Sequence, residues 1–191
     1  MELIGLYLVA AALLVLAGAA KAYRPDDTAR ALAPLLPRPL RALRRARRLV
    51  RAGALAEAAL GLAALILPRP VTAALVAASY AGFAVVVALA RWRGATLATC
   101  GCFGRPDTPP TLVHLFLDVT LAGAAAIVAA AAPTSGTLFA LLGRQPWGGL
   151  PLVAVSAVGL WLAFLALSAL GALEGGRRLV HPGRDPAVAA P

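Results

Sequence analysis

The sequence predicts an all-α integral membrane protein, in which four core transmembrane helices form a bundle and a fifth transmembrane helix follows on the C-terminal side. Two observations predict this class. Hydrophobic residues make up 61% of the 191 residues and the mean hydropathy is +0.82, whereas soluble domains are apolar at about half of their positions. The chain also contains long uncharged windows, and about 20 apolar residues in a helix cross the hydrocarbon core of a bilayer. We therefore expect a multi-pass protein of the cell (inner) membrane.

The five predicted spans are separated by charged or proline-rich segments, and they cover residues 3–20, 52–67, 71–90, 111–132 and 150–173. A signal peptide in place of the first span is disfavoured, because the chain starts with Met1-Glu2 and not with a positive segment. We expect residues 1–132 to form the four-helix domain and residues 133–173 to form a loop and the fifth helix. Residues 174–191 then form a polar tail.

A basic segment, residues 28–51, lies between the first two spans. Apolar positions recur in it at helical spacing, and arginines fill most of the other positions; the apolar positions are Leu40, Leu43, Ala46 and Val50. This pattern predicts an amphipathic helix that lies in the membrane interface and runs into the second span. We expect the arginines between Arg41 and Arg51 to contact membrane lipids through anionic headgroups. No stretch interleaves basic and aromatic residues, so the net charge of +10 does not indicate a nucleic-acid partner.

The distribution of basic residues predicts the orientation of the chain. With five spans, Arg69 and Arg144 fall on one side of the membrane, and the other 16 of the 18 basic residues fall on the opposite side. The positive-inside rule places that second side in the cytoplasm and the N-terminus outside. Both cysteines then lie at the cytoplasmic face.

The two cysteines, Cys100 and Cys102, lie in the loop between the third and fourth spans and are separated by Gly101. A disulfide across one residue closes a very small ring, and glycine supplies the backbone angles that such a ring needs. Departure from relaxed disulfide geometry makes the bond easier to reduce. The pair is therefore better suited to exchanging a disulfide than to holding a fold, and the adjacent Arg105 favours the reactive thiolate.

Two other interpretations of the cysteines stay open. Two thiolates suit Cu(I) or Zn, and His114 would add a nitrogen ligand, although this set lacks the four ligands of a structural zinc site. Soft-metal (copper or zinc) binding or transport is therefore the alternative function. A third interpretation treats the cysteines as small buried apolar residues of a membrane scaffold. The sequence identifies no certain cofactor, and a quinone or an unknown redox partner is the candidate electron acceptor.

Four ionisable residues lie in the predicted spans or directly at their ends, on the same side as the cysteines: Lys21, Glu57, His114 and Asp118. Ionisable groups inside a membrane are costly and usually face a partner. We expect Lys21 to pair with Glu57, and His114 to pair with Asp118 one helical turn away. The alternative for Lys21 and His114 is that they extend to the interface. Gly61, one turn beyond Glu57, would allow close contact between helices.

Three blocks occur in a characteristic order: Lys21, the EAALG block with Glu57 and Gly61, and the CGCFG block from Cys100 to Gly104. Together they resemble MauE, the methylamine utilisation membrane protein family, within the wider MauE/DoxX group of redox-associated membrane proteins. The resemblance covers about residues 3–132. It implies a thiol–disulfide redox helper for maturation, processing or export of a partner protein, which in the family is the small subunit of methylamine dehydrogenase.

The resemblance also assigns roles within the loop. It implies that Cys100 and Cys102 are the redox pair, and that Gly101, Phe103 and Gly104 form the backbone of the thiol loop. The long first loop and the thiol loop on one side also look like the vitamin K epoxide reductase architecture, although the two-residue thiol spacing of that enzyme is absent.

The implied role and the predicted orientation differ. Disulfide donation to an exported protein requires thiols outside, where disulfides persist, whereas the charge distribution places them inside. One solution is that the arginine-rich segment is an interfacial helix that does not obey the loop rule. The other is that the protein exchanges thiols at the cytoplasmic face, and the charge distribution favours this one.

Overall fold

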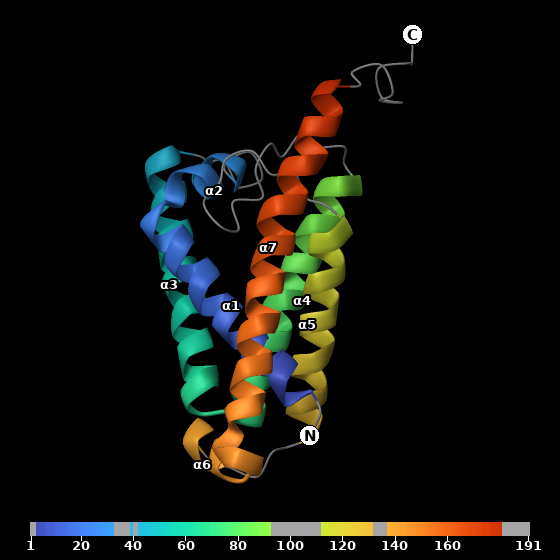
Figure 1. Cartoon of the computed structure of the whole chain (residues 1–191). Coiled ribbons are helices and arrows are strands. Elements are labelled where there is room, and N and C mark those ends of the chain that lie inside the picture. Colours follow the sequence, from blue (N-terminus) through green and yellow to red (C-terminus); the bar gives the residue numbers. More distant parts are fainter. Residues whose placement is uncertain (1–2, 33–38, 40–41, 93–111, 132–136, 181–191) are drawn as a thin grey trace.

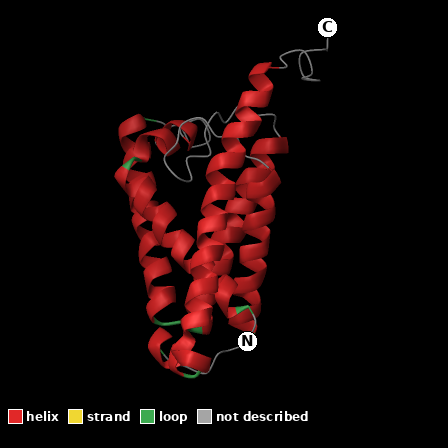
Figure 2. Ribbon diagram, in the orientation of Figure 1, coloured by secondary structure: helices red, strands yellow, loops and turns green. Residues whose placement is uncertain are grey.

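The computed structural model describes residues 3–32, 39, 42–92, 112–131 and 137–180, and all regular structure in these residues is helical (Figure 1 and Figure 2). Five helices are long and apolar enough to cross a bilayer: α1 (Ile4–Tyr23), α3 (Leu43–Ile66), α4 (Pro70–Trp92), α5 (Leu112–Ala130) and α7 (Leu150–Val180). The shorter elements are α2 (Pro25–Leu32), α6 (Leu138–Gly143) and the 3₁₀ helix η3 (Pro146–Gly149). The predicted fold class is confirmed.

The long helices form two pairs. Helix α1 packs along α3, α4 packs along α5, and α7 lies against α1 (Figure 1). Helix α1 runs obliquely through the bundle and also contacts α4 and α5. It is therefore the central helix: half of its spanning window is buried, against 11% for α7.

The chain crosses the bundle from end to end with each long helix, so the two ends collect different segments. At one end, here called the α2 end, α1 and α4 finish and α3 and α5 begin (Figure 1). At the other end, here called the α6 end, α1 begins, α3 turns into α4, and α6 is found (Figure 1). Residues 93–111, which include both cysteines, follow α4 and precede α5 in the chain, and the two helix ends that flank them lie at the α2 end.

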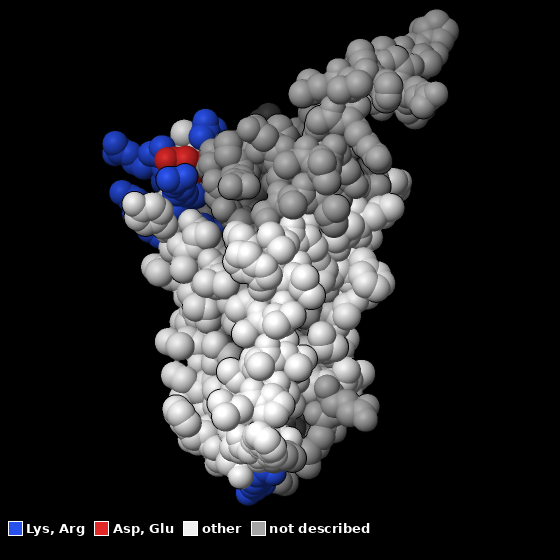
Figure 3. Space-filling view, in the orientation of Figure 1, with Lys and Arg blue, Asp and Glu red and all other residues white. Residues whose placement is uncertain are grey.

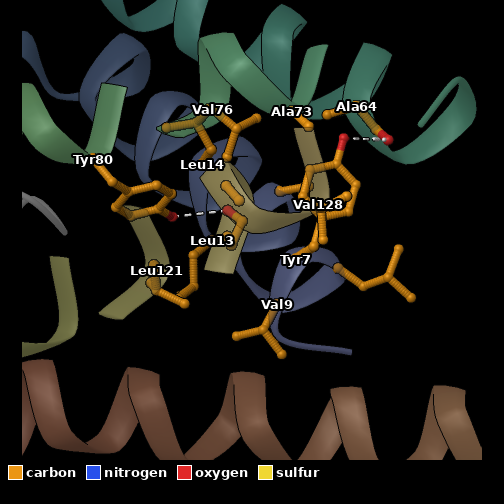
Figure 4. Close-up of a cluster of buried hydrophobic side chains, with 14 of the residues drawn as sticks. Tyr7, Val9, Leu13, Leu14, Ala64, Ala73, Val76, Tyr80, Leu121 and Val128 are labelled. Carbon is orange, nitrogen blue, oxygen red and sulfur yellow. Dashed lines mark hydrogen bonds between the residues drawn. The ribbon is translucent and has the colours of Figure 1, made fainter. Parts of the chain in front are cut away.

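The core lies around α1, and hydrogen bonds of two tyrosines join α1 to neighbouring helices (Figure 4). The Tyr80 hydroxyl of α4 donates a hydrogen bond to the Ala10 carbonyl oxygen at 2.8 Å. The Tyr7 hydroxyl of α1 donates to the Ala64 carbonyl oxygen of α3 at 3.3 Å. Both hydroxyls are thus satisfied where water is absent, as a membrane core requires. The apolar side chains around them include Leu13, Leu14, Val76, Leu121 and Val128.

Two glycines bring α1 and α3 into backbone contact. A Cβ added at Gly18 would lie 2.6 Å from the Ala54 carbonyl oxygen, and one at Gly61 would lie 2.7 Å from the Ala11 carbonyl oxygen. No side chain fits at either position without moving a helix. Small residues at an interface allow this close approach in membranes, and the contact predicted at Gly61 is present.

The basic segment differs in part from its prediction. The apolar positions from Leu40 to Val50 were expected to form an interfacial amphipathic helix that runs into the second span. Helix α3 does run from Leu43 into that span without a break, but the helix α2 that precedes it, Pro25–Leu32, was not predicted. Pro34, Pro37 and Pro39 fall between the two helices, and residues that precede proline avoid the helical region. The arginines beyond Leu43 are the first turns of the spanning helix α3, so the second span is longer than residues 52–67.

The C-terminal region also differs at its boundaries. The segment 133–149, expected to be a loop, contains the short helices α6 and η3, and α7 continues past the expected end at residue 173 to Val180. The other spans begin and end within a few residues of their predicted bounds.

Candidate functional site

The predicted redox residues lie outside the part of the chain that the structure describes. These residues are Cys100, Gly101, Cys102, Phe103 and Gly104. What the structure does describe is where their loop is anchored: α4 ends at Trp92 and α5 begins at Leu112, both at the α2 end (Figure 1). The roles assigned to these residues stay predictions.

Lys21 and Glu57 form an ion pair at the same end of the bundle. Lys21 lies in the last turn of α1, and its side chain is 11% exposed; the Glu57 side chain on α3 is 23% exposed. The pairing follows from the close contact of the two helices, because Gly18 lies one turn before Lys21 and Gly61 lies one turn after Glu57. The predicted contact between Lys21 and Glu57 is therefore present.

An aromatic residue completes the surroundings of Lys21. The Lys21 Nζ lies 4.9 Å from the centre of the Phe83 ring on α4, a distance at which the ring face attracts a cation. The Phe83 ring packs edge-on against Tyr80, with ring centres 5.8 Å apart. Sequence reasoning missed Phe83, because one phenylalanine in an apolar span carries no polar signal.

Helix α5 contributes two further predicted residues. His114 is buried, with 4% of its surface exposed, and Asp118 is partly buried one turn later on the same face. Asp118 lies within electrostatic range of Lys21. Lys21 thus interacts with an acid from α3 and an acid from α5, whereas the expected pairing of His114 with Asp118 stays a prediction.

We refer to Lys21, Glu57, Phe83 and Asp118 as the Lys21 cluster. It joins four helices, α1, α3, α4 and α5, at the end where the thiol loop begins and ends. A charge in a membrane span needs a compensating partner. The Lys21 ammonium is that partner for the Glu57 carboxylate.

The charges outside the cluster are concentrated at its end of the molecule. Figure 3 shows lysine and arginine side chains gathered near α2 and the start of α3, a small group at the opposite end, and an uncharged band between them. The exposed large side chains of this band are apolar, among them Leu55, Leu62, Val85 and Phe116. Such a band is what a membrane-spanning surface requires.

The metal alternative stays a prediction, because it depends on the two cysteines. Within the described residues, no group of three or more histidine, cysteine, aspartate or glutamate side chains could hold a metal ion. The two cysteines lie outside that search.

Comparison of the chain with models of known protein families finds one match. The family model described as methylamine utilisation protein MauE matches residues 2–132. The match spans α1 to α5, the Lys21 cluster and both cysteines. No curated protein and no solved structure matches the chain.

Proposed function

The chain belongs to the MauE family of methylamine utilisation proteins, and from this membership we propose that it is a membrane thiol–disulfide exchange protein that serves the maturation of a partner protein. Cys100 and Cys102 are the exchanging pair in this proposal. The Lys21 cluster is the polar support beneath their loop.

One observation carries the proposal: the Cys-Gly-Cys loop connects α4 to α5 at the end of the bundle where the Lys21 cluster and most of the basic residues lie. Thiolate is the reactive form in exchange, and positive surroundings favour it. Two cysteines separated by one glycine, in a chain with no other cysteine, also leave each thiol a single intramolecular partner. These features suit a cysteine pair that alternates between a disulfide and two thiols.

The exchange needs no reactant other than the partner dithiol and the Cys100–Cys102 disulfide. A partner thiolate attacks one sulfur of the Cys100–Cys102 disulfide, which forms a mixed disulfide and releases the second cysteine as thiolate. The other partner thiolate then attacks the mixed disulfide, so the partner gains a disulfide and the loop gains two thiols. Two electrons and two protons move from the partner to the loop, and the reverse sequence reduces a partner disulfide. The compartment that the loop faces sets the direction.

The test uses the full chain in detergent micelles, oxidised first, and a synthetic peptide that carries two reduced cysteines. We expect the wild-type chain to convert about one peptide dithiol to a disulfide per chain, and to give two free thiols on itself. Cys100→Ser and Cys102→Ser should give no peptide disulfide while inserting normally, because neither can form the internal bond. Full peptide oxidation by either variant, or none by the wild-type chain, would overturn the proposal.

The same preparations test the metal alternative. Copper and zinc are measured in the purified chain before oxidation. Stoichiometric metal that is lost in both serine variants, together with no peptide oxidation, would replace exchange by soft-metal binding.

A further inference from the structure

The arginines at the start of α3 fall into two sets, and one set is occupied by contacts within the chain. Arg47 forms an ion pair with Asp26 of α2. The Arg51 Nε donates to the Ala22 carbonyl oxygen at 3.2 Å. The Arg45 guanidinium donates to the Pro39 carbonyl oxygen at 2.6 Å. Arg45 and Arg47 thus tie α3 to the segment between α1 and α3, and Arg51 ties it to the last turn of α1. All three side chains have a structural role.

Arg44 and Arg48 form the second set. Both are exposed, and neither makes a hydrogen bond or ion pair in the part of the chain that the structure describes. They are four residues apart, so their guanidinium groups rise from the same face of α3 one turn apart.

This face is the one that α3 presents to lipid. Below Arg48 it carries three exposed apolar residues at helical spacing, Leu55, Leu62 and Ile66, which are 57%, 53% and 52% exposed. The opposite face is buried against the rest of the protein and consists of Ala46, Val50, Ala54, Gly61 and Ala64. Arg44 and Arg48 therefore lie at the end of this apolar stripe that is nearest the start of α3.

The length of the stripe places the two arginines at a membrane boundary. At 1.5 Å per residue, Arg48 lies about 27 Å along the axis from Ile66, and the hydrocarbon core of a bilayer is about 30 Å thick. With Ile66 near one edge of the core, the guanidinium groups reach the headgroup layer at the other edge. Ala42, which precedes α3, provides no side-chain cap for the first backbone N–H groups, and free N–H groups at a helix start also favour an anion.

We propose that Arg44 and Arg48 form a binding site for the phosphate of an anionic phospholipid at the α2 end of the bundle. Guanidinium groups bind phosphate oxygens in pairs of hydrogen bonds. The apolar stripe below them accepts the acyl chains of the same molecule, which a free phosphate ion lacks. The site is independent of the thiol pair, since it requires neither cysteine.

The experiment titrates dioleoylphosphatidylglycerol into the full chain in detergent micelles, and native mass spectrometry gives the dissociation constant of the first bound lipid. Replacing each arginine by glutamine should weaken binding by about fivefold, and R44Q/R48Q by about 25-fold. The matched control is R69Q/R144Q, which removes the same charge from two exposed side chains at the α6 end. This control should bind within about twofold of the wild-type chain. Circular dichroism verifies that both double variants keep their helices.

Three outcomes would overturn the proposal. Equal weakening in the two double variants would mean attraction by overall charge only. Equal binding of dioleoylphosphatidylcholine and the anionic lipid would remove the role of the anionic headgroup. Displacement of the bound lipid by inorganic phosphate in modest excess would make the site one for free phosphate and not for a lipid.

Discussion

The two helix pairs of the bundle are held together in different ways. In the α1–α3 pair the backbones touch at Gly18 and Gly61, and the Lys21–Glu57 ion pair closes one end. In the α4–α5 pair, a Cβ added at Gly82 or Gly123 would meet nothing within 4 Å. Neither glycine lies in the contact between α4 and α5, and both helices contribute side chains to the core around α1.

The difference concerns where added side-chain volume is tolerated. Lys21 of the first pair lies 4.9 Å from the ring centre of Phe83 in the second pair, and it also acts electrostatically on Asp118 of that pair. We therefore expect the bundle to be most sensitive to added side-chain volume at the glycines where α1 meets α3, and least sensitive at Gly82 and Gly123. The variants below test this order of sensitivity.

The largest effect is expected for Gly18→Leu. The new side chain would begin 2.6 Å from the Ala54 carbonyl oxygen, so α1 and α3 must separate, and we expect the free energy of unfolding to fall by about 3 kcal/mol. The measurement is unfolding in mixed micelles with increasing dodecyl sulfate, followed by circular dichroism.

The controls for this variant come from the other pair. Gly82→Ala and Gly123→Ala add a Cβ in open space and should change the free energy of unfolding by no more than about 1 kcal/mol, in the stabilising direction. Equal losses in Gly18→Leu and Gly123→Ala would contradict the distinction between the pairs.

A smaller effect is expected when Lys21, which interacts with residues of both helix pairs, is replaced. Lys21→Met leaves Glu57 and Asp118 without their cation inside the membrane, and we expect a loss of about 2 kcal/mol. The double variant Lys21→Met/Glu57→Gln should recover about 1 kcal/mol of this, because the uncompensated carboxylate is gone. The same unfolding assay gives the coupling, and strictly additive losses would show that the pair contributes nothing.

The smallest effect is expected for Phe83→Leu. The variant keeps an apolar side chain but loses the ring beneath Lys21 and against Tyr80, which should cost about 1 kcal/mol. Phe83→Tyr keeps the ring and is the matched control, with a change of about half that size or less. If Phe83→Leu were as stable as the wild-type chain, the contact between Lys21 and the Phe83 ring would not contribute to stability.

The sequence was sufficient to predict the features that runs of apolar residues and isolated charges indicate directly. The five spans follow from runs of apolar residues, and the Lys21–Glu57 contact follows from the need of each charge for a partner within the membrane. Gly18 and Phe83 were missed because their importance depends on how two helices are placed against one another. A glycine in a helix looks the same whether it faces a backbone or open space, as Gly18 and Gly123 demonstrate.

The short helix α2 was missed for another reason. Its eight residues, Pro25–Leu32, are too few to show an apolar stripe over several helical turns. The two roles of the arginines also depend on the fold, because only packing against α2 and the end of α1 distinguishes Arg47 and Arg51 from Arg48. The loop that contains Cys100 and Cys102 lies outside the described residues, and its role rests on the sequence and the family.

The most direct test of the central claim is the redox state of Cys100 and Cys102 in cells, read with a membrane-impermeant maleimide that adds a fixed mass per thiol. The account predicts no tag in intact cells, because the positive-inside rule predicts that the basic α2 end faces the cytoplasm. After permeabilisation it predicts two tags per chain with a reductant and none after brief treatment with a thiol oxidant. Two tags that persist after the oxidant would contradict an exchanging pair. Tags that appear in intact cells only after reduction would keep the pair but reverse the orientation.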